Sequence, residues 1–117
     1  RENETEYTSR AIRMLKKFAK NYGVLVIVVA HPSKMNFNGD TKRPQPYDIN
    51  GSANWYNKSD YCVVVWRPDI AGTKAEIHIS KVKNHDYMGK PGVVDLDFNV
   101  NTGRFDQYVS DREFRKT

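Results

Sequence analysis

The chain has 117 residues, a net charge of +5 and a hydrophobic content of 38%. This size favours one domain or part of one, and enough apolar and aromatic residues are present to exclude disorder over the whole length. The single cysteine, Cys62, excludes an internal disulfide and a cysteine-based metal site. The longest apolar run, Val24 to Ala30, is too short to cross a bilayer, so we expect neither a transmembrane nor a signal segment. Because the chain starts at Arg1 without Met, we expect a piece of a longer protein.

The first half of the chain predicts a helix that leads into a buried strand. Between Glu4 and Tyr22 the apolar residues recur at helical spacing, and Gly23 then ends the helix. The β-branched run from Val24 to Ala30 is typical of a parallel strand covered on both faces. A helix that feeds such a strand indicates an α/β fold.

The second half predicts a loop, a short helix and several strands. Polar residues and Pro dominate from His31 to Tyr47, and Ser52 can cap a short helix that carries Trp55 and Tyr56. Strands are then expected at the following places: Tyr61 to Arg67, Lys74 to Lys83 as its hairpin partner, and Val93 to Phe98 before a turn at Asn101 to Gly103. The charged tail at 110–117 is expected to fray.

Two groups of residues suggest anion binding. His31 follows the predicted buried strand, where α/β sheets place ligand groups, although a lone His in this position is more often a polar residue that ends the strand. The basic loop after it, together with a Gly-Ser helix start, suits phosphates, although any solvated loop has a similar composition. The residues of this second group are Lys34, Lys42, Arg43, Gly51 and Ser52.

A second cationic cluster is predicted where the second strand of the hairpin ends. Lys81 and Lys83 alternate along the strand and so point to one face, near Lys90; such a cluster either binds phosphates or simply faces water. The sequence contains no GxxxxGK[ST] phosphate-binding loop and no obvious nucleophile or paired carboxylates. By these criteria the chain alone is not expected to hydrolyse a substrate.

Three segments, taken in order, resemble a known family: Val28 to Lys34 (VVAHPSK), Asp48 to Asp60 (DINGSANWYNKSD), and Lys81 to Lys83 (KVK) followed by Gly89 to Gly92 (GKPG). They resemble the carboxyl-terminal half of the RecA-like core of Twinkle-like and phage-type primase-helicases and of DnaB-like replicative helicases. The resemblance runs from the first helix to about Gln107. It implies a partial RecA-like ATPase core over residues 1–109, with a mostly parallel central sheet, a helix packed on it and a C-terminal hairpin region.

The resemblance also implies roles for individual residues. His31 matches a γ-phosphate sensor, and Lys81 and Lys83 match a Lys-x-Arg pair that reaches the neighbouring subunit's nucleotide. Lys83 stands where the family has Arg, so it offers a point charge instead of a planar fork. Arg67 and Phe98 match positions that pack against adenine. The residues matching segments that line the channel for single-stranded DNA are Lys34, Lys42, Arg43, Gly51, Ser52 and Lys58.

The function implied is that of an ATP-dependent DNA helicase that translocates on single-stranded DNA as a hexameric ring, with ATP and Mg²⁺ as cofactors of the full-length protein. Walker A and B residues are expected upstream of Arg1, so the chain alone is expected to be inactive and to hold no cofactor. A cytoplasmic protein at the replication fork, bacterial or phage-encoded, is expected. Two alternatives stay open: a non-catalytic module that binds single-stranded nucleic acid, and a fragment of a RecA-type recombination or clamp-loading ATPase.

Overall fold

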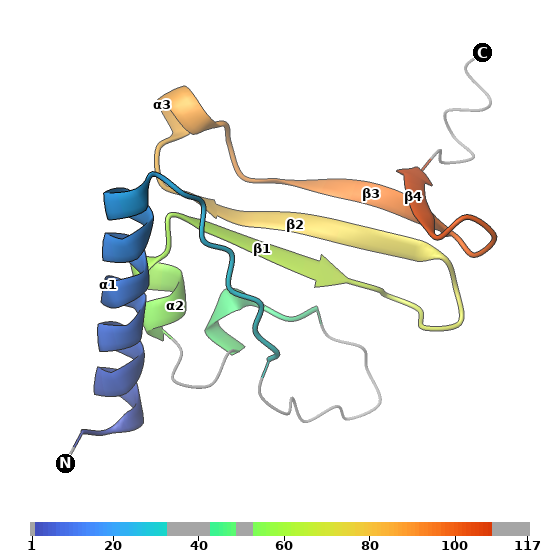
Figure 1. Cartoon of the computed structure of the whole chain (residues 1–117). Coiled ribbons are helices and arrows are strands. Elements are labelled where there is room, and N and C mark those ends of the chain that lie inside the picture. The colour runs from blue at the N-terminus through green and yellow to red at the C-terminus, as the bar shows by residue number, and fades with distance from the viewer. Residues whose placement is uncertain (1, 33–42, 49–52, 109–117) are drawn as a thin grey trace.

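The computed structural model describes residues 2–32, 43–48 and 53–108. It contains three α-helices, one 3₁₀ helix and four strands in this part of the chain (Figure 1). Their bounds are α1 Glu4–Tyr22, η1 Pro46–Asp48, α2 Ala53–Lys58, β1 Tyr61–Trp66, β2 Lys74–Val82, α3 His85–Met88, β3 Gly92–Asn99 and β4 Arg104–Gln107. None of the helices in these ranges has the length and hydropathy that a membrane-spanning helix requires.

Helix α1 confirms the predicted span and shows why it begins and ends there. The side chain of Asn3 accepts a hydrogen bond from the Glu6 amide at 2.8 Å, and the Glu6 carboxylate accepts from the Asn3 amide at 3.3 Å. This reciprocal pair satisfies two amides that the first helical turn leaves without partners. At the other end Gly23 adopts φ 61°, a left-handed conformation that favours glycine, and its amide bonds to the Ala19 carbonyl.

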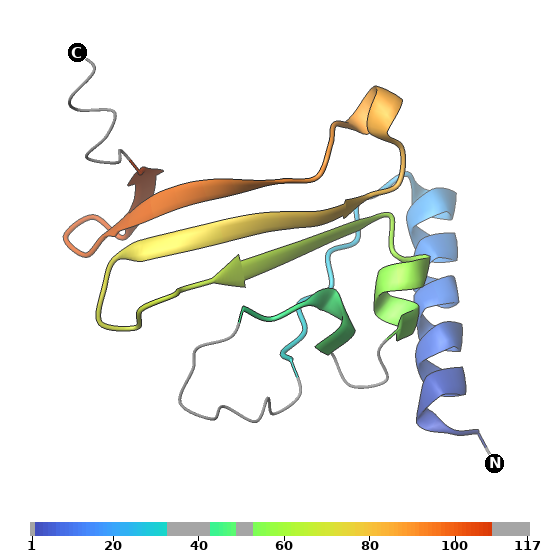
Figure 2. The same cartoon turned by 180° about the vertical axis from the view of Figure 1, so that it is seen from behind.

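Helix α1 stands at one end of the sheet beside α2, as Figures 1 and 2 both show. Its buried side chains are Thr8 and Ile12. The apolar stripe expected from the sequence lies largely in solvent, since Tyr7, Phe18 and Tyr22 are all exposed. The helical period is therefore correct, whereas the face that packs against α2 is offset from the most aromatic one.

The sheet is antiparallel throughout its four strands, with the order β1-β2-β3-β4. The predicted hairpin is confirmed: Trp66 pairs with Glu76 and Tyr61 with Val82, and a bulge lies between Cys62 and Val63. The strand at Val93 to Phe98 is confirmed as part of β3. Strand β4 follows the expected turn and was not predicted.

The expected parallel strand at Val24 to Ala30 is wrong, and so is the mostly parallel sheet. This segment has no strand structure, and Leu25, Ile27 and Val29 are 78, 76 and 86% exposed. A parallel strand needs an aligned neighbour for its backbone N–H and C=O groups. In the described chain, β1 to β4 pair with one another through short connections, and none of them pairs with this segment.

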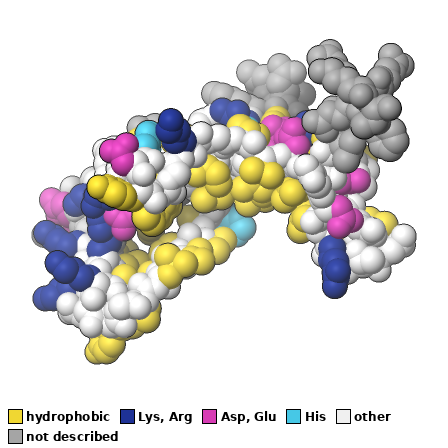
Figure 3. All heavy atoms as spheres, turned by 90° about the horizontal axis from the view of Figure 1, so that it is seen from above, with side chains coloured by type: hydrophobic (Ala, Val, Ile, Leu, Met, Phe, Trp, Pro, Cys, Tyr) yellow, Lys and Arg dark blue, Asp and Glu magenta, His cyan; other side chains and the backbone are white. Residues whose placement is uncertain are grey.

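Few side chains are fully covered. The buried apolar residues of the described chain are Ile12 of α1 and Ala75 and Val82, which lie near the two ends of β2. Figure 3 shows hydrophobic side chains gathered on two facing surfaces with an open gap between them. The fold therefore holds its elements together mainly by strand pairing and by polar contacts where α1, α2 and the sheet meet.

Candidate functional site

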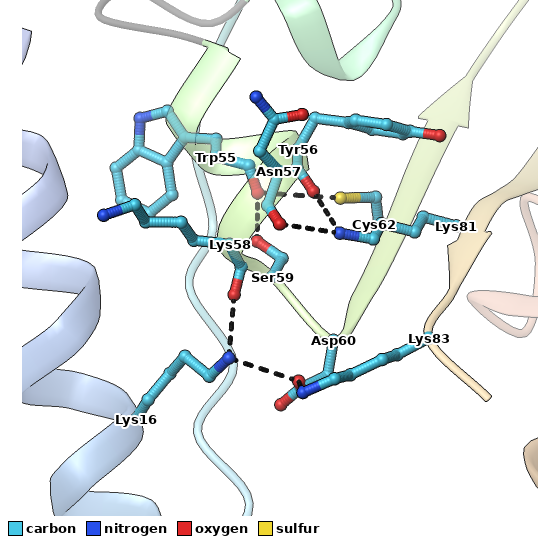
Figure 4. A network of polar contacts seen from close by, with 10 residues as sticks. All are labelled: Lys16, Trp55, Tyr56, Asn57, Lys58, Ser59, Asp60, Cys62, Lys81 and Lys83. Atoms are coloured by element: carbon cyan, nitrogen blue, oxygen red, sulfur yellow. Dashed lines mark hydrogen bonds and ion pairs between the residues drawn. The ribbon is translucent and has the colours of Figure 1, made fainter.

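The end of β2 and the start of β1 meet beside α2, and this junction carries the two lysines that the sequence singled out. The Lys83 amide donates to the Asp60 carbonyl at 2.9 Å, which closes the hairpin just beyond Val82. The Lys83 ammonium lies 3.4 Å from Oδ1 of Asp60. Figure 4 shows both residues pointing toward the same place as Lys16 of α1. Lys83 is thus held at both its backbone and its side chain by one residue.

Lys81 faces the carboxyl end of α2. Its ammonium donates to the carbonyl oxygens of Tyr56 at 2.6 Å and Asn57 at 3.0 Å, and lies 5.2 Å from the centroid of the Tyr56 ring (Figure 4). A positive charge at this end of a helix complements the partial negative charge of its unpaired carbonyls. Lys81 therefore ties strand β2 to α2.

All four carbonyls of the last turn of α2 accept hydrogen bonds from side chains. Ser59 Oγ and, at 3.9 Å, Cys62 Sγ donate to the Trp55 carbonyl. The Lys81 ammonium donates to the Tyr56 and Asn57 carbonyls, and the Lys16 ammonium donates to the Lys58 carbonyl at 3.1 Å. A helix of six residues has little stability of its own, because nearly all its end groups lack intrahelical partners. The surrounding side chains therefore fix α2 in place.

Helix α1 completes this junction. The Lys16 ammonium lies 3.4 Å from Oδ1 of Asp60, the same oxygen that faces the Lys83 ammonium. The ammonium of Lys58 donates to Ser9 Oγ, and the Asn54 side chain donates to the Thr5 carbonyl at 3.2 Å. Three lysines, Lys16 of α1 and Lys81 and Lys83 at the end of β2, thus surround Asp60 and the end of α2; we call this group the lysine cluster.

Cys62 borders the lysine cluster. Burial raises the pKa of its thiol, while a hydrogen bond with Ser59 and the charge of Lys81 act in the opposite direction. At neutral pH the side chain is therefore a protonated thiol that donates weakly to the Trp55 carbonyl. It helps to hold α2 and has no sign of a reactive thiolate.

Arg67 and Phe98 both lie at the opposite end of the sheet, Arg67 just after β1 and Phe98 in β3, with β2 between these strands. The Arg67 guanidinium donates to the carbonyls of Ile70 at 3.1 Å and Gly72 at 3.0 Å, within the β1–β2 connection. The Phe98 amide donates to the Thr73 carbonyl at 2.8 Å, and its ring lies 5.0 Å from that of Phe105. The two residues expected to contact adenine are therefore anchored on neighbouring parts of one sheet end.

The two groups are separated by the length of β2. Nine residues form this strand, with the Arg67 end before Lys74 and the lysine cluster at Val82. At about 3.3 Å per residue the strand spans roughly 26 Å. One nucleoside triphosphate cannot lie against both ends.

The remaining predicted residues are less closely associated. His31 is exposed, and the segment that carries it runs from the end of α1 toward η1 in Figures 1 and 2; none of the hydrogen bonds or ion pairs of the described residues joins it to Lys81 or Lys83. Arg43 faces the side-chain amide of Gln45. The other predicted DNA contacts, Lys34, Lys42, Gly51 and Ser52, lie outside the described residues, as does the proposed cap of α2.

Sequence reasoning missed Asp60 and Lys16. Asp60 is the last residue of the segment Asp48 to Asp60 that resembles the family. Its position immediately before a predicted strand was the one feature of the sequence that could have indicated a role. No pattern in the sequence pairs it with a lysine on α1. Within the described ranges there is no group of three or more His, Cys, Asp or Glu side chains arranged to hold a metal ion.

A family model described as "DnaB-like helicase C terminal domain" matches residues 1–107. The chain belongs to this family. The match covers α1, the lysine cluster and all four strands of the sheet. It confirms the resemblance seen in the three sequence segments.

Relatives within and near this family are moderately similar to the chain. The "Twinkle homolog protein, chloroplastic/mitochondrial" of Arabidopsis thaliana is 34% identical over 109 residues, covering 90% of this chain. "Replicative DNA helicase DnaB" of Buchnera aphidicola is 31% identical over 92% of this chain, and that of Haemophilus influenzae is 28% identical over 97%. The chain spans 15% of the Twinkle homolog and 24 and 25% of the two DnaB proteins.

A solved structure supports the fold. This structure, described as an "ATPase Domain", superposes with a TM-score of 0.74 and 24% identity, covering 92% of this chain and 39% of that one. The antiparallel sheet with its flanking helices is therefore part of the fold of that domain.

Proposed function

We propose that the chain is the part of an ATP-dependent replicative DNA helicase that stands between two nucleotides of a ring. The observation that carries this proposal is the separation of the lysine cluster from the Arg67 and Phe98 end by the length of β2. A chain that contacts one triphosphate at each end suits a head-to-tail ring, in which every subunit has one neighbour at each of two different surfaces.

At the lysine cluster, Lys83 is the group proposed to act on the neighbour's nucleotide. Its side chain is 65% exposed, and that of its partner Asp60 is 46% exposed. An ammonium has three N–H donors, so Lys83 can keep its contact with Asp60 and still donate to a phosphate oxygen. Lys83 would then place a positive charge beside the γ-phosphoryl group as negative charge develops there.

At the other end, Arg67 and Phe98 are proposed to contact the adenine of the subunit's own nucleotide. The two carbonyls that Arg67 meets fix the plane of its guanidinium, and a guanidinium held in this way can stack its face on a purine. The Phe98 ring is half-buried against Phe105, so only its edge is proposed to contact the adenine.

The residues present suit a triphosphate better than a metal ion. Lysines and an arginine supply donors to phosphate oxygens, whereas the described residues offer no carboxylate cluster for Mg²⁺. Bound MgATP supplies the phosphoryl group and a charge-neutralising cation. This chain contributes orientation and positive charge to that reaction, and the GxxxxGK[ST] loop absent from its sequence must come from elsewhere in the ring.

Two observations support the proposal that the chain contacts single-stranded DNA: its positive charge and the names of its relatives. The net charge of +5 and the basic residues Lys34, Lys42 and Arg43 suit a single-stranded polyanion. Relatives are named as replicative DNA helicases. The assignment of His31 as a γ-phosphate sensor, and of Gly51, Ser52 and Lys58 as DNA contacts, remains a prediction.

ATP turnover in assembled rings tests the proposal. Lys83→Ala, made in the intact polypeptide that carries this chain, is expected to lower kcat about tenfold or more while rings still form. Lys83→Arg, which introduces the family's residue, should keep turnover at or above the starting level. Lys17→Ala, at an exposed lysine of α1, is the control and should have no effect. Unchanged turnover in Lys83→Ala would refute the role of Lys83 at the neighbour's nucleotide. No ATP turnover in the unsubstituted polypeptide, with DNA binding retained, would favour a non-catalytic binding module instead.

A further inference from the structure

Asp60 holds Lys83 at two points. Its carbonyl accepts the Lys83 amide at 2.9 Å, which fixes where the backbone leaves β2, and its carboxylate lies 3.4 Å from the Lys83 ammonium. The lysine side chain has several freely rotating bonds, so its ammonium reaches a defined position only where something holds it. Asp60 is the carboxylate that does so in the described structure (Figure 4).

Asp60 is itself positioned by a second lysine. Lys16 of α1 lies 3.4 Å from the same carboxylate oxygen and donates to the Lys58 carbonyl at 3.1 Å. The carboxylate is therefore fixed relative to α1 and to the end of α2. It also separates two ammonium groups that would otherwise repel each other at short range.

We propose that Asp60 is the positioning residue for Lys83. It directs the Lys83 ammonium to the edge of the subunit and offsets the charge of Lys16, which would push Lys83 away if the carboxylate were removed. This inference rests on the proposed function, because it requires Lys83 to act on a nucleotide bound by the neighbouring subunit.

The expected effect is modest because both partners are exposed. Exposed ion pairs contribute little, so loss of the carboxylate should change turnover about fivefold. A group that acts only as charge develops in the transition state changes kcat and leaves KM for ATP unaltered. A general loss of structure would instead lower the melting temperature and ring assembly.

The experiment measures ATP turnover in rings of the intact polypeptide for Asp60→Asn, Lys83→Ala and the double variant. Asp60→Asn is expected to lower kcat about fivefold at constant KM, and to have no further effect when Lys83 is already Ala. Asp60→Glu, which restores the charge, should recover most of the loss. Asp95→Asn is the matched control: that carboxylate is 42% exposed and lies 3.8 Å from the Lys74 ammonium, away from the lysine cluster.

The outcomes separate this inference from the proposed function. If Lys83→Ala leaves ATP turnover unchanged, both the proposed function of Lys83 and the positioning role of Asp60 are refuted. If Lys83→Ala is impaired while Asp60→Asn is not, or if the two losses multiply in the double variant, the proposed function stands and Asp60 has no positioning role.

A measurement on the unsubstituted protein decides the case even if Asp60→Asn fails to assemble. Protons of the ¹⁵N-labelled Lys83 ammonium should exchange with water more slowly than those of the Lys90 ammonium, because the Asp60 carboxylate holds the Lys83 ammonium. Equal exchange at the two ammonium groups would overturn the inference.

Discussion

Replacing Lys81 by Met tests whether side chains hold α2 in place. The substitution keeps most of the apolar stem and removes the ammonium that donates to the Tyr56 and Asn57 carbonyls. A hydrogen bond to a charged group contributes about 1.5–3 kcal/mol, and the second, exposed bond contributes less. An exposed cation–π contact adds about 0.5 kcal/mol. Allowing for water that solvates the freed carbonyls, we expect a loss of about 2 kcal/mol in the local stability of α2.

Amide hydrogen exchange gives the assay, since it reports local opening. A loss of about 2 kcal/mol corresponds to roughly 30-fold faster exchange for the amides of α2. Amides in the middle of β2, such as Ile77, should change much less, because the ladder with β1 and β3 remains. Lys90→Met is the control. Exchange in α2 within about twofold of the unsubstituted protein would refute the claim that Lys81 fixes this helix.

Three further predictions concern other parts of the chain. Asn3→Ala removes the cap of α1 and should lower the free energy of unfolding by about 1 kcal/mol in urea titrations, whereas an unchanged midpoint would show that the cap is dispensable. Because burial raises the pKa of Cys62, alkylation by iodoacetamide should be slower than for a free cysteine peptide at pH 8 and should accelerate at higher pH; equal rates would contradict this. Replacing Lys34, Lys42 and Arg43 by Ala should reduce the salt dependence of single-stranded DNA binding by about two units in log K against log salt, and an unaltered slope would remove them from the DNA interface.

Features set by neighbouring residues were predictable from the sequence. The span of α1, the β1–β2 hairpin and strand β3 follow from spacing, turns and alternation, all of which act over a few residues. The resemblance also led to Lys81 and Lys83 as a pair, and the structure does bring them to one junction with α2.

Features that depend on distant partners were not predictable in the same way. The run at Val24 to Ala30 has the composition of a buried strand, but composition does not say whether another strand pairs with it. Likewise, the roles of Asp60 and Lys16 depend on α1 meeting the end of α2, which no local pattern reports. Strand β4 is short and exposed, so its sequence lacks the apolar alternation that would have marked it.

Mixed rings test most directly whether Lys83 serves the neighbour's nucleotide. One population carries Lys83→Ala, and the other carries a substitution that abolishes nucleotide binding in the ring protein's own phosphate-binding loop. If Lys83 acts across the subunit boundary, random mixing in equal amounts leaves about one interface in four with both functional parts, so ATP turnover should return to about a quarter of the unsubstituted level. Turnover no higher than that of either variant alone would contradict the account.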